Sequence, residues 1–347
     1  MPNHLNRALV LVALVCAIAI IPTIAIGQEA TAPPPPPFAD WLADLRKEAL
    51  ARGITERTVE AALTGVEPLP VVVERDKAQP ERTLTIDEYL KRRVDRKTVR
   101  TARDMARRHA SVLKKVSAQY GVPPAVIVAV WGLESNFGRF SGVRPTIAAL
   151  ATLAYDNRRA AMFREELFAA LQMIDRGDID LAKMKGSWAG AMGQPQFMPS
   201  SYLKYAEDFD RDGARDIWGS TTDVFASIAN FLKQSGWTPG ARWGAAVTLA
   251  AGSAKRIEEA APLPSQGCEA VRQMPSGLAL ARWRELGVHV TSRHTPPGPT
   301  TLASLVHAGT RNFLVFDNYS VLLRYNCAHA YALAVGLLAD QIQQRQP

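Results

Sequence analysis

The run Val128-Ala129-Val130-Trp131-Gly132-Leu133-Glu134-Ser135-Asn136-Phe137-Gly138 continues an apolar segment that starts at Ala125 and ends in a single carboxylate. Pro123 and Pro124 open the segment, and proline is favoured in the first turn of a helix. The side chains are apolar on nearly every side, which is typical of a buried helix. We therefore predict a helix that begins near Pro124, is buried on most sides and ends near Glu134.

Glu134 is the candidate functional residue of this helix. A carboxyl group at the end of a buried apolar helix loses hydration, which raises its pKa and keeps it protonated near neutral pH. A general acid for glycosidic cleavage needs that property. The alternative is a structural glutamate that simply points to water from the end of the helix.

Composition narrows the class of protein and of partner. The 347 residues are 47% hydrophobic and 21% charged, as expected of a globular protein with a substantial core, and the net charge is +8. A basic surface suits a polyanion such as nucleic acid, acidic cell wall or anionic lipid, without choosing among them.

The N-terminus indicates export. Arg7 precedes an uncharged apolar run, Ala8–Ile26, and small residues stand before Gln28, so residues 1–27 are read as a secretory signal or, alternatively, as an uncleaved membrane anchor. Residues 28–37 include five consecutive prolines and form a polyproline linker. Val15 precedes Cys16, where a lipoprotein signal needs a small residue, so we predict no lipidation there.

Export also makes a disulfide possible between Cys268 and Cys327, the two cysteines left after signal removal. The alternative is two separate buried thiols.

Residues 38–240 are expected to form a helical region. We predict an extended connection at Glu67–Arg82 and one long helical pattern from Thr85 to about Tyr120. That pattern is dense in Lys and Arg, but acidic residues are interspersed and no stacking aromatics accompany them. We therefore interpret it as a solvated helix face and expect no nucleic-acid partner.

A glycine-rich segment, Gly186–Tyr202, follows two further predicted helices, Ile147–Tyr155 and Ala161–Asp175. Small residues let the backbone approach a ligand, and Ser187 and Gln196 offer polar contacts beside apolar walls. The alternative is a tight packing loop.

The segment from Asp208 to Asp216 follows the pattern of a calcium-binding loop. Carboxylates stand at positions 1, 3, 5 and 9, glycine stands at position 6, and the carbonyl at position 7 is a further ligand; these are Asp208, Asp210, Asp212, Asp216, Gly213 and Ala214. Gly219 replaces the usual glutamate at position 12, so Asp223 is expected to close the site. The alternative is an aspartate-rich turn.

The sequence pattern changes from helical to strand-like after residue 240. Residues 241–325 contain strand-like segments at Ala245–Leu249, Gly287–Thr291 and Phe313–Phe316, separated by turns, and predict a small α+β lobe. Residues 326–347 predict a C-terminal helix, Ala328–Ile342, that packs back on the core. The expected fold class is therefore mainly α, with a small β-containing lobe.

Taken together, the motifs resemble those of the membrane-bound lytic murein transglycosylase B family, over about Asp40 to Ile342. The resemblance rests on four motifs in the family's order, Trp131–Arg139, Gly186–Gly193 with Gln196–Ser201, Asp208–Gly213, and Tyr325-Asn326 with Tyr331. It implies a lysozyme-like helical core and a periplasmic enzyme that acts on peptidoglycan strands. The implied reaction cleaves the β-1,4 bond between N-acetylmuramic acid and N-acetylglucosamine without water and leaves 1,6-anhydro ends.

The family's roles carry over by position. Glu134 would be the single acid and base, Ser187 would hold its carboxyl group, and Gln196 would contact the glycan. Tyr325, Asn326 and Tyr331 would line the same groove, and the Asp208 loop matches the family's calcium site. The chain departs from the family at Phe231, where some members have a groove-facing tyrosine. We also expect a monomer, tethered to the membrane only if residues 8–26 are retained.

Two other functions remain open at this level. A hydrolytic muramidase would need a second carboxylate, for which Asp156 is the nearest candidate outside the calcium loop. A non-catalytic, calcium-stabilised wall-binding protein would not need Glu134 at all.

Overall fold

The computed structural model describes residues 36–78, 84–156, 159–291 and 297–344. The predicted signal or anchor at residues 1–27, and the linker up to residue 35, lie outside them. Within these ranges no single helix has the length and apolarity to cross a membrane. Two helix pairs that are bent at a short break, Ala110–Tyr120 with Pro124–Ser135 and Asp317–Tyr325 with His329–Gln343, reach that combined length and apolarity only when each pair is counted together.

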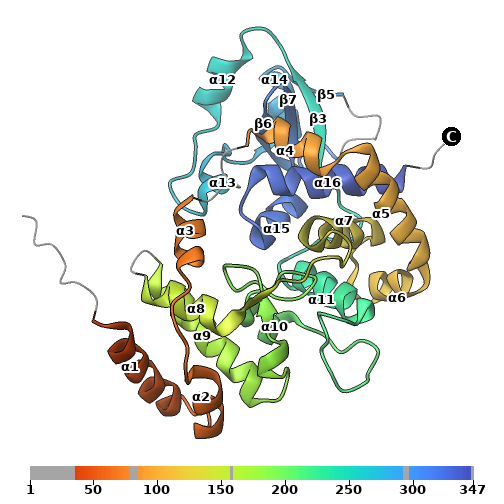
Figure 1. Cartoon of the computed structure of the whole chain (residues 1–347). Coiled ribbons are helices and arrows are strands. Elements are labelled where there is room, and N and C mark those ends of the chain that lie inside the picture. Colours follow the sequence, from red (N-terminus) through yellow and green to blue (C-terminus); the bar gives the residue numbers. More distant parts are fainter. Residues whose placement is uncertain (1–35, 79–83, 157–158, 292–296, 345–347) are drawn as a thin grey trace, which may run out of the picture. The chain divides into compact units, whose positions relative to one another are not determined.

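Helices dominate the described residues, and a small sheet completes the fold, which confirms the mainly α fold class with a small β-containing lobe (Figure 1). The α-helices are α1 (Phe38–Ala51), α2 (Glu56–Leu63), α3 (Pro70–Ala78), α4 (Ile86–Arg93), α5 (Arg96–Arg108), α6 (Ala110–Tyr120), α7 (Pro124–Ser135), α8 (Thr146–Tyr155), α9 (Ala160–Asp175), α10 (Pro199–Tyr205), α11 (Thr221–Gln234), α12 (Ser253–Ala260), α13 (Glu269–Arg272), α14 (Leu280–Glu285), α15 (Asp317–Tyr325) and α16 (His329–Gln343).

The segment Thr85–Tyr120 is three helices, so the expectation of one long helical pattern was wrong. Helix α4 ends at Arg93 with Val94 as its C-cap, and Asp95 starts α5, because its side chain accepts a hydrogen bond from the Thr98 N–H at 2.7 Å. Thr85 and Glu88 form a reciprocal capping box that starts α4. The expected extended connection at Glu67–Arg82 also contains a helix, α3.

The lobe contains an antiparallel five-stranded sheet with the order β4-β6-β7-β3-β5. Its strands are β3 (Gly244–Leu249), β4 (Leu278–Ala279), β5 (Val288–Val290), β6 (Leu302–Ala308) and β7 (Arg311–Val315). A separate short pair joins β1 (Arg144–Pro145) to β2 (Lys185–Gly186). Strands β4 and β6 were not predicted, whereas β3, β5 and β7 overlap the three strand-like segments.

The sheet has a core on each face. In β7, Phe313 and Val315 join the large core of the helical body, while Leu314 joins a second, smaller core with Trp283. This alternation follows from the two-residue period of a strand. One face of the sheet is therefore attached to the helical body through packed side chains.

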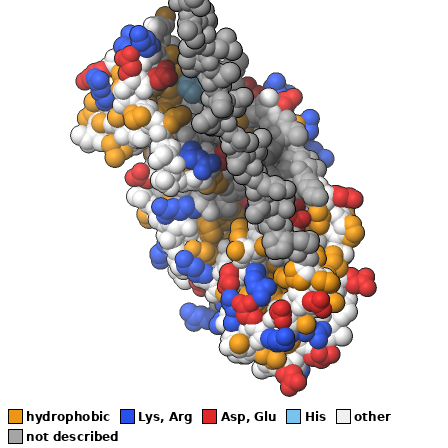
Figure 2. All heavy atoms as spheres, turned by 90° about the vertical axis from the view of Figure 1, so that its left-hand side faces the viewer, with side chains coloured by type: hydrophobic (Ala, Val, Ile, Leu, Met, Phe, Trp, Pro, Cys, Tyr) orange, Lys and Arg blue, Asp and Glu red, His pale blue; other side chains and the backbone are white. Residues whose placement is uncertain are grey.

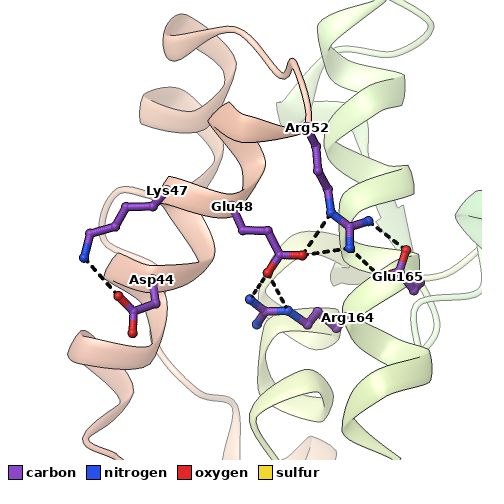
Figure 3. A network of polar contacts seen from close by, with 6 residues as sticks. All are labelled: Asp44, Lys47, Glu48, Arg52, Arg164 and Glu165. Carbon is purple, nitrogen blue, oxygen red and sulfur yellow. Dashed lines mark hydrogen bonds and ion pairs between the residues drawn. The ribbon is translucent and has the colours of Figure 1, made fainter.

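Charged residues hold the N-terminal helix α1 on α9 (Figure 3). Arg52 donates two hydrogen bonds to Glu165 at 2.7 and 2.8 Å and a third to Glu48 at 2.9 Å, while Arg164 donates to the other oxygen of Glu48. These side chains are partly exposed, so the network stabilises α1 modestly. On the face shown in Figure 2, acidic and basic side chains are interspersed in the same way.

Candidate active site

Helix α7 carries Glu134 and is held by the turn that follows it. The Ser135 hydroxyl donates to the Trp131 carbonyl at 2.9 Å and accepts from the Gly138 N–H at 3.0 Å. Asn136 and Phe137 then adopt left-handed backbone conformations, with φ of 51° and 59°, which are sparsely populated for such residues. The helix therefore ends in a tight turn directly after Glu134.

Side chains from three other helices lie close enough to interact electrostatically with Glu134. Tyr89 and Arg93 come from α4, Tyr325 ends α15, and Tyr331 lies in the first turn of α16. The Arg93 guanidinium donates to the Leu133 carbonyl, which anchors it beside the end of α7. The Tyr331 hydroxyl is buried and has no well-aligned hydrogen-bond partner among the described residues, so its contact with Glu134 is loosely aligned.

Burial raises the pKa of the Glu134 carboxyl to about 7, against the opposing effects of Tyr331 and of the Arg93 charge. Among the described residues, no second carboxylate contributes to this pKa. Burial also raises the pKa of Tyr325 and Tyr331 well above the usual value, so both hydroxyls stay neutral. The site thus combines one carboxyl group, Glu134, that changes charge near neutral pH with the neutral hydroxyls of Tyr325 and Tyr331 and the charged Arg93.

Of the residues predicted at the C-terminal end, the structure brings Tyr325 and Tyr331 within reach of the Glu134 charge, and Asn326 directly follows Tyr325 as the C-cap of α15. The Asn326 side chain is exposed, while its N–H caps α15 at the Leu322 carbonyl. Phe231 lies in a buried aromatic cluster, with ring centroids 4.6 Å from Tyr325 and 4.7 Å from Tyr205. It therefore packs against the Tyr325 and Tyr205 rings.

Ser187 and Gln196 lie together in a groove of about 490 Å³. The other lining residues are Arg75, Phe140, Val143, Arg144, Gly186 and Trp188. Gly142, with a φ of 99°, lies so close to the Gly186 backbone that a Cβ atom would approach it to 2.2 Å, so only glycine brings the Phe140–Val143 segment against Ser187. Glu134 is not a lining residue, but the Tyr325 hydroxyl donates to the Pro195 carbonyl at 2.7 Å, directly before Gln196.

Gln194, a residue that the sequence did not single out, joins α7 to the aspartate-rich loop. Its Oε1 accepts from Trp131 Nε1 at 2.7 Å, and its Nε2 donates to the Trp218 carbonyl at 2.7 Å. The side chain is 7% exposed, so both hydrogen bonds are shielded from water. Arg93 and Tyr89 were also missed, because the Lys- and Arg-rich pattern around Arg93 indicated a solvated face and the contact to α7 has no local sequence signal.

The aspartate loop places three predicted metal ligands together. Single oxygens of Asp208, Asp210 and Asp212 lie within 4.8 Å of one another. Asp223 accepts hydrogen bonds from the N–H groups of Phe209, at 2.8 Å, and Asp216, at 3.1 Å, and so ties the two ends of the loop.

Asp216 and Ala214, the other predicted ligands of the loop, make different hydrogen bonds. The Asp216 carboxylate accepts from the backbone N–H groups of Trp218, Gly219 and Ser220. Ala214 donates its N–H to Asp212 at 2.9 Å. Three converging carboxylates fit a hard, oxygen-preferring cation. All five aspartates of the loop also accept hydrogen bonds from its backbone.

Cys268 and Cys327 form a disulfide between the lobe and the segment that connects α15 to α16. The bond thus lies two residues from Tyr325. It joins Cys268, which caps the short helix α13, to the chain that carries both site tyrosines.

The chain matches the family described as the Transglycosylase SLT domain (SLT_2) over residues 37–340. It is 33% identical over 235 residues to the membrane-bound lytic murein transglycosylase B of Escherichia coli strain K12, an alignment that covers 67% of this chain and 61% of that protein. The chain thus spans less than two thirds of the length of that relative.

Two solved structures extend the comparison. SltB3 of Pseudomonas aeruginosa, in complex with NAG-anhNAM-pentapeptide, is 41% identical, with a TM-score of 0.78 over 88% of this chain and 79% of that one. The Escherichia coli lytic transglycosylase Slt35, in complex with calcium, is 28% identical, with a TM-score of 0.72 over 88% and 92%. These likenesses confirm the predicted lysozyme-like helical core.

Proposed function

The chain belongs to the SLT_2 transglycosylase family, as its motifs predicted, and from that premise we propose that it is a peptidoglycan lytic transglycosylase. The proposed reaction cleaves the β-1,4 bond between N-acetylmuramic acid and N-acetylglucosamine and leaves 1,6-anhydro ends. The observation that carries it is a single carboxyl group, Glu134, with a pKa of about 7 and no second carboxylate acting on it among the described residues. A hydrolase that uses two carboxylates would have a second carboxylate beside the acid.

In the proposed mechanism Glu134 acts twice. Its neutral carboxyl group first donates a proton to the glycosidic oxygen as the bond from the muramoyl C1 breaks. The resulting carboxylate then takes the proton of the muramoyl 6-hydroxyl while that oxygen bonds to C1. The proton count balances without water, and a pKa near 7 leaves both protonation states accessible.

The neighbours of Glu134 support this cycle. Tyr331 and the positive charge of Arg93 both lower the pKa of Glu134, so both would stabilise the carboxylate formed after the first step. Neither group competes for the proton, because arginine stays charged and burial keeps Tyr331 neutral.

Substrate positioning is assigned to the groove with Ser187 and Gln196. The Ser187 hydroxyl accepts from the N–H groups of Ala189 and Ala191, which orients it, and Gln196 holds a left-handed φ of 53° through a hydrogen bond to the Gly193 carbonyl. Both polar groups stand beside Trp188, a suitable apolar wall for a sugar ring. Asn326, exposed near Tyr325, is assigned to the outer edge of the same binding region.

The test compares wild type with Glu134→Gln on purified peptidoglycan, with products identified by mass spectrometry. We expect anhydromuramoyl ends from wild type and a rate reduced by about a hundred- to ten-thousandfold in the variant. Hydrated ends would identify a hydrolytic muramidase. Wall binding without products from either folded protein would identify a binding protein.

We also propose that Asp208, Asp210 and Asp212 hold a structural calcium ion, with the Ala214 carbonyl as a further ligand. The ion would bridge carboxylates that otherwise repel one another. Calcium at about one hundred times its Kd should stabilise the folded protein by about 2.7 kcal/mol, seen as a higher melting temperature.

The matched control for calcium is the exposed Asp44 of α1. Asp210→Asn with Asp212→Asn should remove the calcium-dependent stabilisation, and Asp44→Asn should keep it. An equal calcium response in all three proteins would contradict the assignment.

The proposed subcellular location follows from the substrate. Peptidoglycan lies outside the cytoplasm, so we propose a periplasmic enzyme, exported through residues 1–27, that works as a monomer on glycan strands. Cleavage before Gln28 or retention of an anchor would show in the mass of the purified protein.

A further inference from the structure

A second groove lies away from Glu134, between α4, α5, α16 and the turn that joins β6 to β7. Its volume is about 900 Å³. Figure 1 shows α4, α5 and α16 beside one another below the sheet. The groove has an apolar wall that includes Leu90, Val94, Val99 and Leu337. We name it the basic groove for the cations described next.

Six cationic side chains and two carboxylates line the basic groove. The cations are Lys91, Arg96, Arg100, Arg103, Arg107 and Arg311. Each carboxylate already has a partner, since Asp87 pairs with Arg311 at 3.2 Å and Asp104 pairs with Arg107. Arg103 donates to the Gln341 carbonyl at 2.7 and 2.9 Å.

Three cations remain without a partner. Among the described residues, the side chains of Lys91, Arg96 and Arg100 make no hydrogen bond or ion pair, although the Lys91 charge acts on Glu88 of the same helix; all three are exposed. Like charges gathered on one concave surface repel one another, so their arrangement favours an anionic ligand.

The basic groove is separate from the Glu134 site. On α16, Tyr331 faces Glu134 while Gln341 lines the basic groove, and ten residues of helix span about 15 Å. On α4, Arg93 contacts α7, whereas Lys91, two residues earlier, points to a different side of the helix.

We propose that the basic groove binds the acidic peptide stems of the wall polymer, as a second attachment point apart from the cleavage site. This inference rests on the proposed function. The sugars offer hydroxyl and acetamido groups, so carboxylates on the peptides are the part of the polymer that unpaired cations would recognise. The solved complex of SltB3 contains such a pentapeptide.

The shape of the groove favours a peptide over a lipid surface. A flat layer of anionic headgroups would contact only a rim, whereas a peptide with small apolar groups between its carboxylates matches both the apolar wall and the cations. Salt should weaken the ion pairs between the peptide carboxylates and the three cations, because the three cations are exposed.

The experiment reverses the three unpaired charges, as Lys91→Glu, Arg96→Glu and Arg100→Glu, in the full chain. Binding is measured by co-sedimentation with insoluble peptidoglycan in the Glu134→Gln background, so that cleavage does not alter the polymer. We expect affinity to fall by about tenfold or more at low salt, and less at high salt. The neutral variant, with Gln at the same positions, should fall between.

The matched control carries the same charge change on exposed cations outside the groove, Arg108→Glu, Lys114→Glu and Lys115→Glu. It should bind intact peptidoglycan as wild type does. Circular dichroism and melting temperature verify that all variants are folded.

Peptidoglycan whose peptide carboxylates have been converted to neutral amides separates this inference from the proposed function. Wild type and the groove variant, each with Glu134 intact, should cleave the amidated polymer equally, and only the untreated polymer should distinguish them. Equal binding of intact polymer by the groove variant and its control would overturn the inference. So would a groove-dependent loss of binding to vesicles of phosphatidylglycerol with no change on peptidoglycan. Absence of cleavage by wild type would instead refute the proposed function.

Discussion

At the residue scale, the pKa of Glu134 predicts a pH profile. The first step needs the neutral carboxyl group, and the fraction that is neutral falls as the pH rises through about 7. We expect kcat/KM for glycan cleavage to decline above that pH, by about tenfold per unit at the limit. A profile flat to pH 9 would show that Glu134 is not the acid.

The same pKa predicts a pH-dependent gain in stability for Glu134→Gln. The pKa of about 7 in the folded protein lies above the reference value of 4.5. The neutral carboxyl group therefore contributes its full stabilisation below pH 4.5, and this contribution is lost as the pH rises through 7. Glutamine cannot ionise, so the variant should exceed wild type in free energy of unfolding by about 1–3 kcal/mol at pH 8 and show no such gain at pH 4. Urea denaturation at both pH values measures this, and an equal difference at both would contradict the assigned pKa.

Tyr331 offers a second test at this scale. Its hydroxyl lowers the pKa of Glu134, so Tyr331→Phe should move the alkaline limb of the activity profile to higher pH. The fold should persist, since the variant removes a buried hydroxyl that has no well-aligned partner. A loss of rate at every pH with an unmoved limb would indicate substrate binding as the main role of Tyr331.

At the element scale, α7 depends on a hydrogen-bonded bridge from outside itself. Gln194→Leu should leave Trp131 Nε1 and the Trp218 carbonyl without partners and cost about 2–4 kcal/mol in free energy of unfolding. Because Trp131 lies one helical turn before Glu134, kcat should fall as well.

Chemical denaturation and Trp fluorescence measure the effect of Gln194→Leu. The exposed Gln273→Leu is the control and should change neither stability nor rate. Unchanged stability in Gln194→Leu would show that the bridge does not hold α7.

At the scale of the whole molecule, the disulfide joins the lobe to the C-terminal helices. Cys268 and Cys327 stand 59 residues apart, so the bond restricts a long loop in the unfolded chain. Cys268→Ser with Cys327→Ser should lower the free energy of unfolding by about 2–4 kcal/mol. Denaturation with and without reductant checks this: reductant should weaken wild type to the level of the variant and leave the variant unchanged.

The sequence by itself determined the elements with strong local patterns. The apolar run after Pro123 predicted α7, and the structure starts that helix at Pro124 and ends it at Ser135. Alternating and helical periods located most of the lobe's strands and α16. The cap at Asp95 was not recognised from the sequence, so α4, α5 and α6 were predicted as one helical segment. The spacing of the aspartates located the loop, because its members are neighbours along the chain.

Only the tertiary structure decided what surrounds Glu134. Arg93 reaches the Leu133 carbonyl across 40 residues, and Gln194 reaches Trp131 across 63, while Tyr331 arrives from the far end of the chain. The sequence indicated burial and therefore a raised pKa, but the groups that moderate that pKa depend on which helices pack on α7. The packing of distant helices sets those contacts, and no local period or cap encodes them, which is why an arginine in a seemingly solvated stretch lies beside the candidate acid.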